Sequence, residues 1–234
     1  MKIKNRYFIL SMIIMGIILL ISARCKKDSD NATIIKDVDG NNYHTKSIGT
    51  QVWMIENLKT KRYNSGEQIP NITDESDWSA ITKGAYCDYN NDTNNALIYG
   101  RLYNWYAVND PRGLAPKGWH IATDNDWAIL VEYLGGDSVA GGKMKESGTK
   151  HWVSSNNEVT NESGFTALPG GLRFFTVGDE FQAIGHTGAW WTHSEDTSKF
   201  VYWFMFSTNK RINRVEGIGP SDKNIGLSIR CVKD

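Results

Sequence analysis

The sequence predicts an α+β fold in which small helices pack on a mainly antiparallel, twisted sheet. Apolar residues at helical spacing gather in the middle of the chain. Stretches rich in aromatic and β-branched residues, separated by turn signals, lie before and after this helical region. Helices and strands that occupy separate regions favour α+β over a doubly wound sheet, in which they would alternate.

The first predicted element is a β-hairpin. Residues 43–48 and 51–55 flank a Gly-Thr pair and follow residues 37–42, a turn-forming stretch rich in Asp and Asn. This stretch could form a calcium loop, but an EF-hand requires a glutamate at the twelfth position of the loop. The chain has Ile48 there, and we therefore interpret the stretch as a plain turn.

A first helix is predicted over residues 100–109, because Leu102, Trp105 and Tyr106 share one face at helical spacing. Trp105, and Trp127 further along, resemble the flat rings on which sugars stack. At these spacings such large aromatic residues more often belong to the core, since they dominate packing on a buried stripe. We therefore expect both side chains to be buried.

A second helix is predicted directly after Thr123. Residues 123–126 resemble a capping box, with Asp in place of the usual Glu or Gln. A Gly-Gly pair at residues 135–136 ends the helix, and the apolar stripe before it consists of Trp127, Leu130, Val131 and Leu134. A third, shorter helix is predicted over residues 138–146.

The remainder of the chain is predicted to be β-structure. Strands are predicted at residues 164–168, ending at a Pro-Gly-Gly turn, and at 189–193, 200–206 and 225–232. Both faces of the 200–206 segment are apolar, so this strand is predicted to lie in the centre of a sheet.

The N-terminus has the pattern of an export signal. Lys2, Lys4 and Arg6 precede an apolar run over residues 7–21, which is shorter than the roughly 20 residues that cross a membrane as a helix. We therefore favour a cleaved signal over an uncleaved anchor. The predicted organisation is a lipoprotein signal peptide over residues 1–24, a lipid-anchored tether over 25–36 and a single domain over 37–234.

Cys25 is predicted to carry the lipid. It follows Ser-Ala-Arg, which resembles a bacterial lipobox at the alanine and the cysteine but departs from it at Arg24, where a small residue is usual. The polar stretch after Cys25 resembles the surface-export tag of some bacterial lipoproteins. These features predict an outer-membrane lipoprotein of the cell envelope, on the external or the periplasmic face.

The charge balance excludes one class of partner. The whole chain has 26 basic and 26 acidic residues, but its first 24 residues contain four of the basic ones and no acidic one. The remaining chain therefore has a net charge of −4. An acidic surface gives no means of neutralising phosphates, so binding of nucleic acid is not expected.

Six stretches spread along the mature chain resemble one known family. They are residues 39–43, 48–58, 99–107, 116–120, 161–171 and 228–232. Together they are similar to the Fibrobacter succinogenes major paralogous domain, a family of secreted and lipoprotein modules. The resemblance implies a divergent C-type-lectin-like fold, related in shape to the formylglycine-generating enzymes, and it implies no general activity.

Against this family, the chain departs at two positions. It has Ala115 where the family often has Cys, and Ala122 where the family often has Pro. With Cys25 acylated, Cys87 is left as the candidate partner of Cys231. In an oxidising compartment we expect a disulfide between these two, worth about 4–5 kcal/mol in the chain-entropy model. The alternative is a pair of unbonded, buried thiols.

The sequence gives little support to an enzyme. None of its five histidines lies in a recognised catalytic or metal motif, and an oxygen-activating copper site would need a pair of cysteines near Cys231. No cofactor and no metal are therefore expected. The most site-like cluster is His193 with Glu195, after Trp191, although a strand end that enters a polar loop would look the same.

Binding is the preferred function. The Glu-Pro-Asn type triplets of calcium-dependent lectins do not occur in the chain, so a site would have to act without calcium. We expect it in the loop 215–224, with Asp222 and Asn224, and around Trp191, His193 and Glu195. The expected protein is a non-enzymatic, membrane-anchored module that binds a glycan or a surface protein. The alternatives are a cryptic hydrolase and a purely structural envelope protein.

Overall fold

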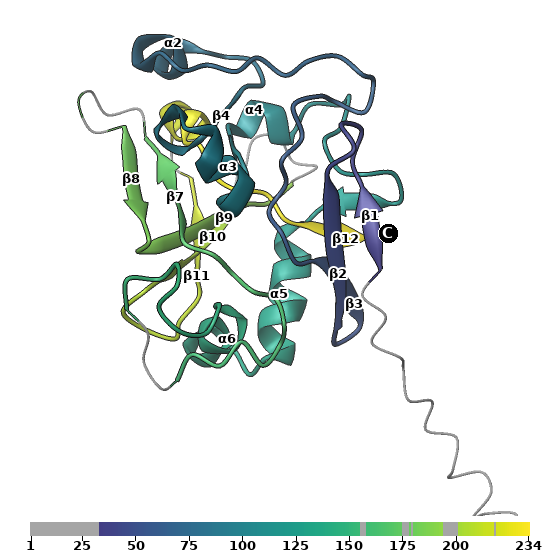
Figure 1. Ribbon diagram of the computed structural model, residues 1–234, viewed down its shortest axis with the longest axis vertical. Helices are drawn as coiled ribbons and strands as arrows, with labels where there is room; N and C mark the ends of the chain where they lie inside the picture. The colour runs from purple at the N-terminus through teal and green to yellow at the C-terminus, as the bar shows by residue number, and fades with distance from the viewer. Residues whose placement is uncertain (1–32, 155–157, 175–177, 179, 194–200, 218) are drawn as a thin grey trace, which may run out of the picture. The chain divides into compact units, whose positions relative to one another are not determined.

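The structure, a computed structural model, describes residues 33–234 except 155–157, 175–177, 179, 194–200 and 218 (Figure 1). The predicted signal peptide, Cys25 and most of the predicted tether lie outside these residues. Residues 32–234 group into a single unit by their contacts. No helix in the described part of the chain is long and apolar enough to cross a membrane.

A five-stranded antiparallel sheet contains both ends of the described chain. Its order is β1-β2-β3-β12-β6, formed by Ile34–Lys36, Asn42–Ile48, Gln51–Met54, Cys231–Lys233 and Trp119–Ile121. The predicted hairpin is confirmed as β2 and β3, with Ile48 opposite Gln51. Strand β12 lies between β3 and β6, so the C-terminal strand is an inner strand of the sheet to which the N-terminal strands belong (Figure 1).

A three-stranded antiparallel sheet forms a second layer. It consists of β9 (Thr187–Trp191), β10 (Val201–Phe206) and β11 (Asn213–Glu216), with β10 in the middle. The predicted central position of this strand is therefore confirmed. One of its faces is buried, whereas the other holds half-buried rings and ends at Phe206, which is 43% exposed.

Two further strand pairs complete the β-structure. Strand β4 (Tyr86–Cys87) pairs with β5 (Leu102–Tyr103), and β7 (Gly170–Arg173) pairs with β8 (Phe181–Ile184). The described helices are α2 (Glu75–Ala80), α3 (Thr93–Tyr99), α4 (Trp105–Val108), α5 (Asp124–Tyr133) and α6 (Asp137–Met144), with short 3-10 turns η1 (Tyr89–Asn91) and η2 (Pro220–Asn224). The fold is thus a mixture of short helices and antiparallel sheets, as the sequence predicts.

Helix α5 begins and ends where the sequence places it. The hydroxyl group of Thr123 accepts a hydrogen bond from the backbone N–H of Asp126, and the Asp126 carboxylate accepts one from the backbone N–H of Thr123. This capping box is confirmed. The side chains of the predicted stripe are buried, and Trp127 forms the centre of an aromatic cluster with Trp53, Phe165, Trp190 and Trp203.

Three predicted elements differ from the structure. Only Trp105–Val108 of the predicted 100–109 helix is helical, because Leu102 and Tyr103 pair with β4 and the Asn104 side chain caps the new helix at Ala107 N. Residues 164–168 form a loop rather than a strand, and β7 begins at Gly170 instead. Within the predicted 225–232 strand, residues 226–228 make single bridges to three different segments, and β12 starts only at Cys231.

A buried asparagine joins three of the family-like stretches in the core. Asn57 Oδ1 accepts hydrogen bonds from Trp190 Nε1 at 2.8 Å and from Arg230 Nε at 2.6 Å, and its Nδ2 donates to Tyr99 O at 2.7 Å. Arg230 is 1% exposed and donates its other hydrogen bonds to backbone carbonyls, including Met54 O. Burial lowers the pKa of Arg230 to about 9.

Candidate functional site

The structure assigns packing roles to part of the site predicted around Trp191. The Trp191 side chain is 0% exposed, and its Nε1 donates to Tyr103 O at 2.8 Å, so this ring offers no open face to a ligand. His193 lies half-buried two residues after the end of β9, where its backbone N–H donates to Ala122 O. Glu195 lies outside the described residues.

The other predicted residues lie in η2. The Asp222 carboxylate accepts a hydrogen bond from Gly219 N, and the buried Asn224 donates from Nδ2 to Ser79 O at 2.6 Å. These bonds fix η2 to its own turn and to α2. Tyr202 interacts with residues of both predicted groups. Its ring centre lies 5.7 Å from that of Trp191. Its pKa is raised mainly by burial and, to a smaller extent, by the negative charge of Asp222.

The expected disulfide is not formed in the structure. Cys87 and Cys231 are both free and buried, and they belong to different core clusters. Burial raises the pKa of Cys87 to about 12 and also raises that of Cys231, so both are poor thiolates at neutral pH. The structure corresponds to the alternative of two unbonded thiols.

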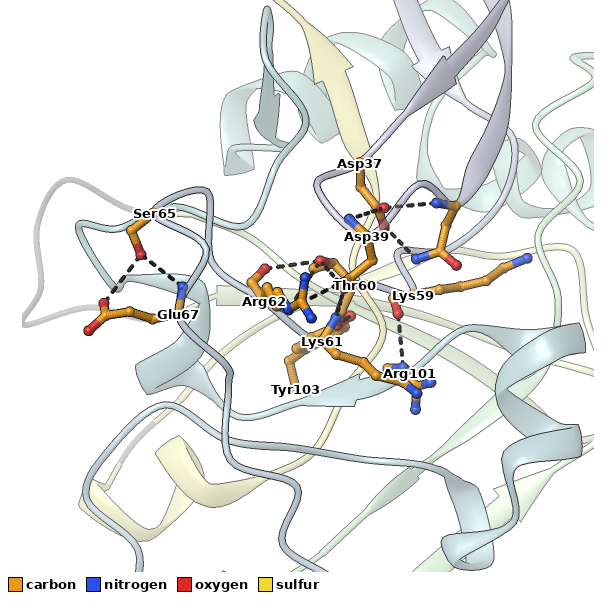
Figure 2. A network of polar contacts seen from close by, with 11 residues as sticks. Asp37, Asp39, Lys59, Thr60, Lys61, Arg62, Ser65, Glu67, Arg101 and Tyr103 are labelled. Atoms are coloured by element: carbon orange, nitrogen blue, oxygen red, sulfur yellow. Dashed lines mark hydrogen bonds and ion pairs between the residues drawn. The ribbon is translucent and has the colours of Figure 1, made fainter.

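A different part of the surface has the features of a binding site, and it is organised by the segment 59–62 (Figure 2). Side chains from other parts of the fold hold this segment by its backbone. Lys59 N donates to Tyr43 Oη at 2.9 Å, Lys59 O accepts from Arg101 Nε at 2.8 Å, and Thr60 O accepts from Tyr103 Oη at 2.7 Å. The segment is therefore fixed before any ligand arrives.

The acidic turn after β1 holds the same segment from the other side. The Asp39 carboxylate accepts from Lys61 N at 2.5 Å and from Thr60 Oγ1 at 3.0 Å. The Asp37 carboxylate accepts from backbone and side chain of Asn41, and from Tyr43 Oη at 2.6 Å. Both carboxylates of the turn are thus engaged in protein hydrogen bonds, as Figure 2 shows for Asp37.

Two hollows adjoin on this side of the molecule. The smaller, of about 380 Å³, is lined by Asp39, Lys61, Arg62, Gln68, Ile69, Pro70, Asn71 and Tyr86. The larger, of about 510 Å³, is lined by Gln68, Pro70, Thr82, Lys83, Gly84, Trp105, Tyr106, Asn109, Asp110, Pro111 and Arg112. Because they share Gln68 and Pro70, we call them together the trough. Both volumes fall within the roughly 300–1,000 Å³ of ligand pockets.

Aromatic rings and a glycine form the inner wall of the larger hollow. Trp105 is 5% exposed and Tyr106 is half-buried, and their rings meet edge to face at 5.9 Å. Lys223 Nζ lies 4.4 Å from the centre of the Trp105 ring, which places the predicted η2 loop next to the trough. A side chain at Gly84 would force this wall to shift, since a Cβ would lie 2.0 Å from Tyr63 Oη.

The amide of Asn109 is the most unusual polar group of the larger hollow. Both Nδ2 and Oδ1 are shielded from solvent, and neither has a hydrogen-bond partner among the described residues. A buried polar group without a partner costs roughly 1–3 kcal/mol. Because no described residue is hydrogen-bonded to this amide, a bond from it to a ligand would replace none within the described part of the chain.

The charged groups of the trough fall into two classes. Arg112 is paired, because its guanidinium contacts Asp110 at 2.7 Å and Glu67 at 3.0 Å, and these hydrogen bonds raise its pKa and lower those of both carboxyl groups. Lys61 and Lys83 have no ion pair within the described part of the chain. The charge that remains available to a ligand is therefore positive.

The trough was not apparent from the sequence. Trp105 was correctly predicted to be buried, but the hollow beside it needs residues near positions 68, 83 and 109 that only the fold brings together. The one usable signal was the Asn-Trp-Tyr run at residues 104–106, which lies in a family-like stretch. No group of three or more metal-ligating side chains occurs among the described residues.

Comparison with known proteins identifies the family of the chain. A model of the Fibrobacter succinogenes major domain matches residues 47–233, which include every lining residue of the larger hollow. Comparisons with curated proteins and with solved structures give no match. Since the match spans most of the chain, in agreement with the six similar stretches, the protein belongs to the Fibrobacter succinogenes major domain family.

Proposed function

We propose that this protein is a non-enzymatic module that binds a glycan, and that the larger hollow of the trough is the binding site. The observation that carries the proposal is the Asn109 amide, which has no hydrogen-bond partner among the described residues and lines the same hollow as the half-buried ring of Tyr106. A sugar presents an apolar face to an aromatic ring and hydroxyl groups to amides, so this pair of side chains matches both of its surfaces.

Rigidity favours this site over other parts of the surface. The inner wall is backed by the core residues Trp105 and Ala107, and Arg112 is fixed by two carboxylates and by the Tyr63 ring, which lies 4.0 Å below its guanidinium. Few side chains would lose freedom on binding, and the entropic cost of binding is correspondingly lower.

The proposal also includes export of the protein to the cell envelope and a relationship to the C-type-lectin-like fold. A lipid on Cys25 would hold the module at the outer membrane, where glycans of the cell envelope or the surroundings are within reach. A C-type-lectin-like arrangement, implied by the family resemblance, would agree with such a role. The mixed antiparallel sheets support this relationship only at the level of fold class.

Binding is tested with the purified full chain on an array of plant and microbial glycans, followed by calorimetry. We expect a glycan ligand, with binding weakened at least about tenfold by Tyr106→Ala, since stacking of a sugar on the ring would be lost. Tyr133→Ala is the matched control, because Tyr133 is 64% exposed and lines a separate hollow. A clean negative on the array, or equal loss in the control, would contradict the proposed site.

Lipidation is tested by metabolic labelling of cells with a fatty-acid analogue. The wild-type chain is expected to take up the label and to fractionate with the outer membrane, and Cys25→Ser is expected to do neither. Cys87→Ser serves as the control, since Cys87 is buried in the domain. Label that persists in Cys25→Ser would show that the anchor lies elsewhere.

One observation favours the alternative of a hydrolase. His151 Nδ1 lies 2.8 Å from Glu146 Oε2, and a carboxylate that orients a histidine is a common part of catalytic sites. Neither residue lines the trough, and no hydroxyl or thiol group in the described part of the chain is hydrogen-bonded to His151. Turnover of any glycan that is abolished by His151→Ala would favour this alternative.

A further inference from the structure

The two hollows of the trough differ in the charge that they offer to a ligand. The larger combines the Tyr106 ring and the Asn109 amide with the paired Arg112. The smaller is lined by Lys61 and Arg62 and has no aromatic wall except the Tyr86 ring. Both hollows are lined by Gln68 and Pro70, so two neighbouring units of a chain-like ligand would find them side by side.

The single carboxylate of the smaller hollow is already engaged by the protein. Asp39 accepts hydrogen bonds from Lys61 N and Thr60 Oγ1, and its other oxygen lies 3.6 Å from Arg62 Nε. The terminal nitrogens of Arg62 have no hydrogen bond within the described residues, and the side chain is 47% exposed. The Lys61 ammonium group likewise has no ion pair there.

The backbone that carries both cations is held in place. Lys61 N donates to Asp39, Arg62 N donates to Thr60 Oγ1 at 3.3 Å, and Thr60 O accepts from Tyr103 Oη (Figure 2). Two cations on a fixed segment form an anion site at a smaller entropic cost than two cations on a mobile loop. Side-chain amides of Gln68 and Asn71 line the same hollow and can donate to the same anion.

The charge of the trough is opposite to that of the rest of the domain. The chain after residue 24 has a net charge of −4, whereas the cations without an ion pair here are Lys61 and Lys83. An acidic protein repels an anionic polymer at long range, so a local excess of positive charge is where such a polymer would be held.

We infer that the ligand is an acidic glycan, with one sugar ring against Tyr106 in the larger hollow and the anionic group of a neighbouring sugar between Lys61 and Arg62 in the smaller one. This inference rests on the proposed function and adds to it the chemical class of the ligand. A carboxylate fits both cations, because a guanidinium group can donate two parallel hydrogen bonds to it. A sulfate group offers the same chemistry.

The test compares matched polymers on the purified full chain. Polygalacturonate and alginate are the carboxylated probes, methyl-esterified polygalacturonate is the same backbone without charge, and chondroitin sulfate adds sulfate groups. The inference expects the free acid to bind at least about tenfold more tightly than its ester, with an affinity that falls as salt is added. Tighter binding of the sulfated polymer would support the anion site and assign sulfate as its natural partner.

Variants locate the charge effect. Lys61→Gln and Arg62→Gln are each expected to reduce the preference for acid over ester by about tenfold, while binding of the ester is unchanged. Lys150→Gln removes an exposed cation outside the trough and is the matched control. Both test residues are exposed, and thermal unfolding of each variant verifies that it is folded.

Three results would overturn the inference. Equal binding of acid and ester that still depends on Tyr106 would leave the proposed function intact and remove the anion site. An equal effect of Lys150→Gln would show general attraction rather than a site. Binding of none of these polymers, with no neutral glycan bound on the array either, would overturn the inference and the proposed function together.

Discussion

Two asparagines of this protein have shielded amide groups and opposite surroundings. Asn57, 4% exposed, makes three hydrogen bonds, with Trp190, Arg230 and Tyr99. Asn109, in the wall of the larger hollow, makes none through its side chain with the described residues. One amide therefore uses its whole capacity on the fold except for a single N–H, whereas the other leaves all of it available.

This difference separates scaffold from site better than composition does. Both regions combine tryptophan with polar residues, and both lie within the part of the chain that the family model matches. Around Asn57 the polar atoms are satisfied by the protein, which makes them necessary for stability and useless for recognition. In the trough, the Asn109 amide has no hydrogen-bond partner among the described residues, so a ligand can supply one, and the free protein is less stable in return.

The largest effect is expected for Asn57→Ala. The change leaves the buried donors Trp190 Nε1 and Arg230 Nε without their acceptor, and a buried guanidinium that loses a partner is especially costly. We expect the free energy of unfolding, measured with denaturant, to fall by about 3–5 kcal/mol. Asn42→Ala, on an exposed position of β2, is the control. A loss no larger than in that control would remove the distinction drawn between the two amides.

A smaller loss of unfolding free energy is expected when a side chain is added at Gly84, in the wall of the larger hollow. In Gly84→Ala the new Cβ would lie 2.0 Å from Tyr63 Oη and 3.0 Å from Ala107 Cα, so the wall must shift. Overpacking of this kind costs about 1–3 kcal/mol. The double variant with Tyr63→Phe removes the closest atom and is expected to recover a large part of the loss. A single variant as stable as wild type would show that the wall is not rigid.

The sequence predicts those elements whose signals are local. The hairpin of β2 and β3 has its turn residues between its strands, and α5 carries both its capping box and its apolar stripe. The 100–109 segment is not one helix, because the backbone of Leu102 and Tyr103 pairs with β4, and the helical spacing of its apolar residues does not reveal this pairing. Asn104 then caps a helix that starts five residues later than predicted, at Trp105.

The site is less predictable than the fold for a related reason. Trp191 and Asn224 are residues of the kind that a binding site near a loop would use, but in the fold Trp191 Nε1 donates to Tyr103 O and Asn224 Nδ2 donates to Ser79 O. The sequence shows that position 109 is an asparagine, but it does not show that the side-chain amide has no hydrogen-bond partner among the described residues. That absence depends on how segments near positions 68, 84 and 105 pack, which no local pattern encodes.

A third polar cluster, around His120, shows whether hydrogen bonds without burial contribute as much to stability as we expect for Asn57. His120 contacts Asp234 through Nδ1 at 2.9 Å and Asp126 through Nε2 at 3.0 Å, but its side chain is 39% exposed. Burial acts to lower the pKa of His120, and the hydrogen bonds to the two carboxylates outweigh it, so the pKa is raised. Its contribution to stability is therefore present at acid pH and is lost as the pH rises through this pKa.

For His120→Gln we accordingly expect a deficit in unfolding free energy that is larger at pH 5.5 than at pH 8.5. The deficit should stay below about 1 kcal/mol, because the pair is exposed to solvent. His186→Gln is the control, since His186 has no carboxylate partner among the described residues. A loss of unfolding free energy as large as that of Asn57→Ala would mean that the number of hydrogen bonds a side chain makes, and not its burial, determines the loss of stability.

The smallest effect on stability, and a large one on binding, is expected for Asn109→Ala. The substitution breaks no side-chain hydrogen bond to the described residues and removes an unsatisfied amide, while the backbone N–H that closes α4 is kept. Unfolding free energy should therefore change by less than about 0.5 kcal/mol or rise. Glycan affinity should fall about tenfold, because the ligand loses both a donor and an acceptor. Destabilisation comparable to Asn57→Ala would instead assign this amide to the scaffold.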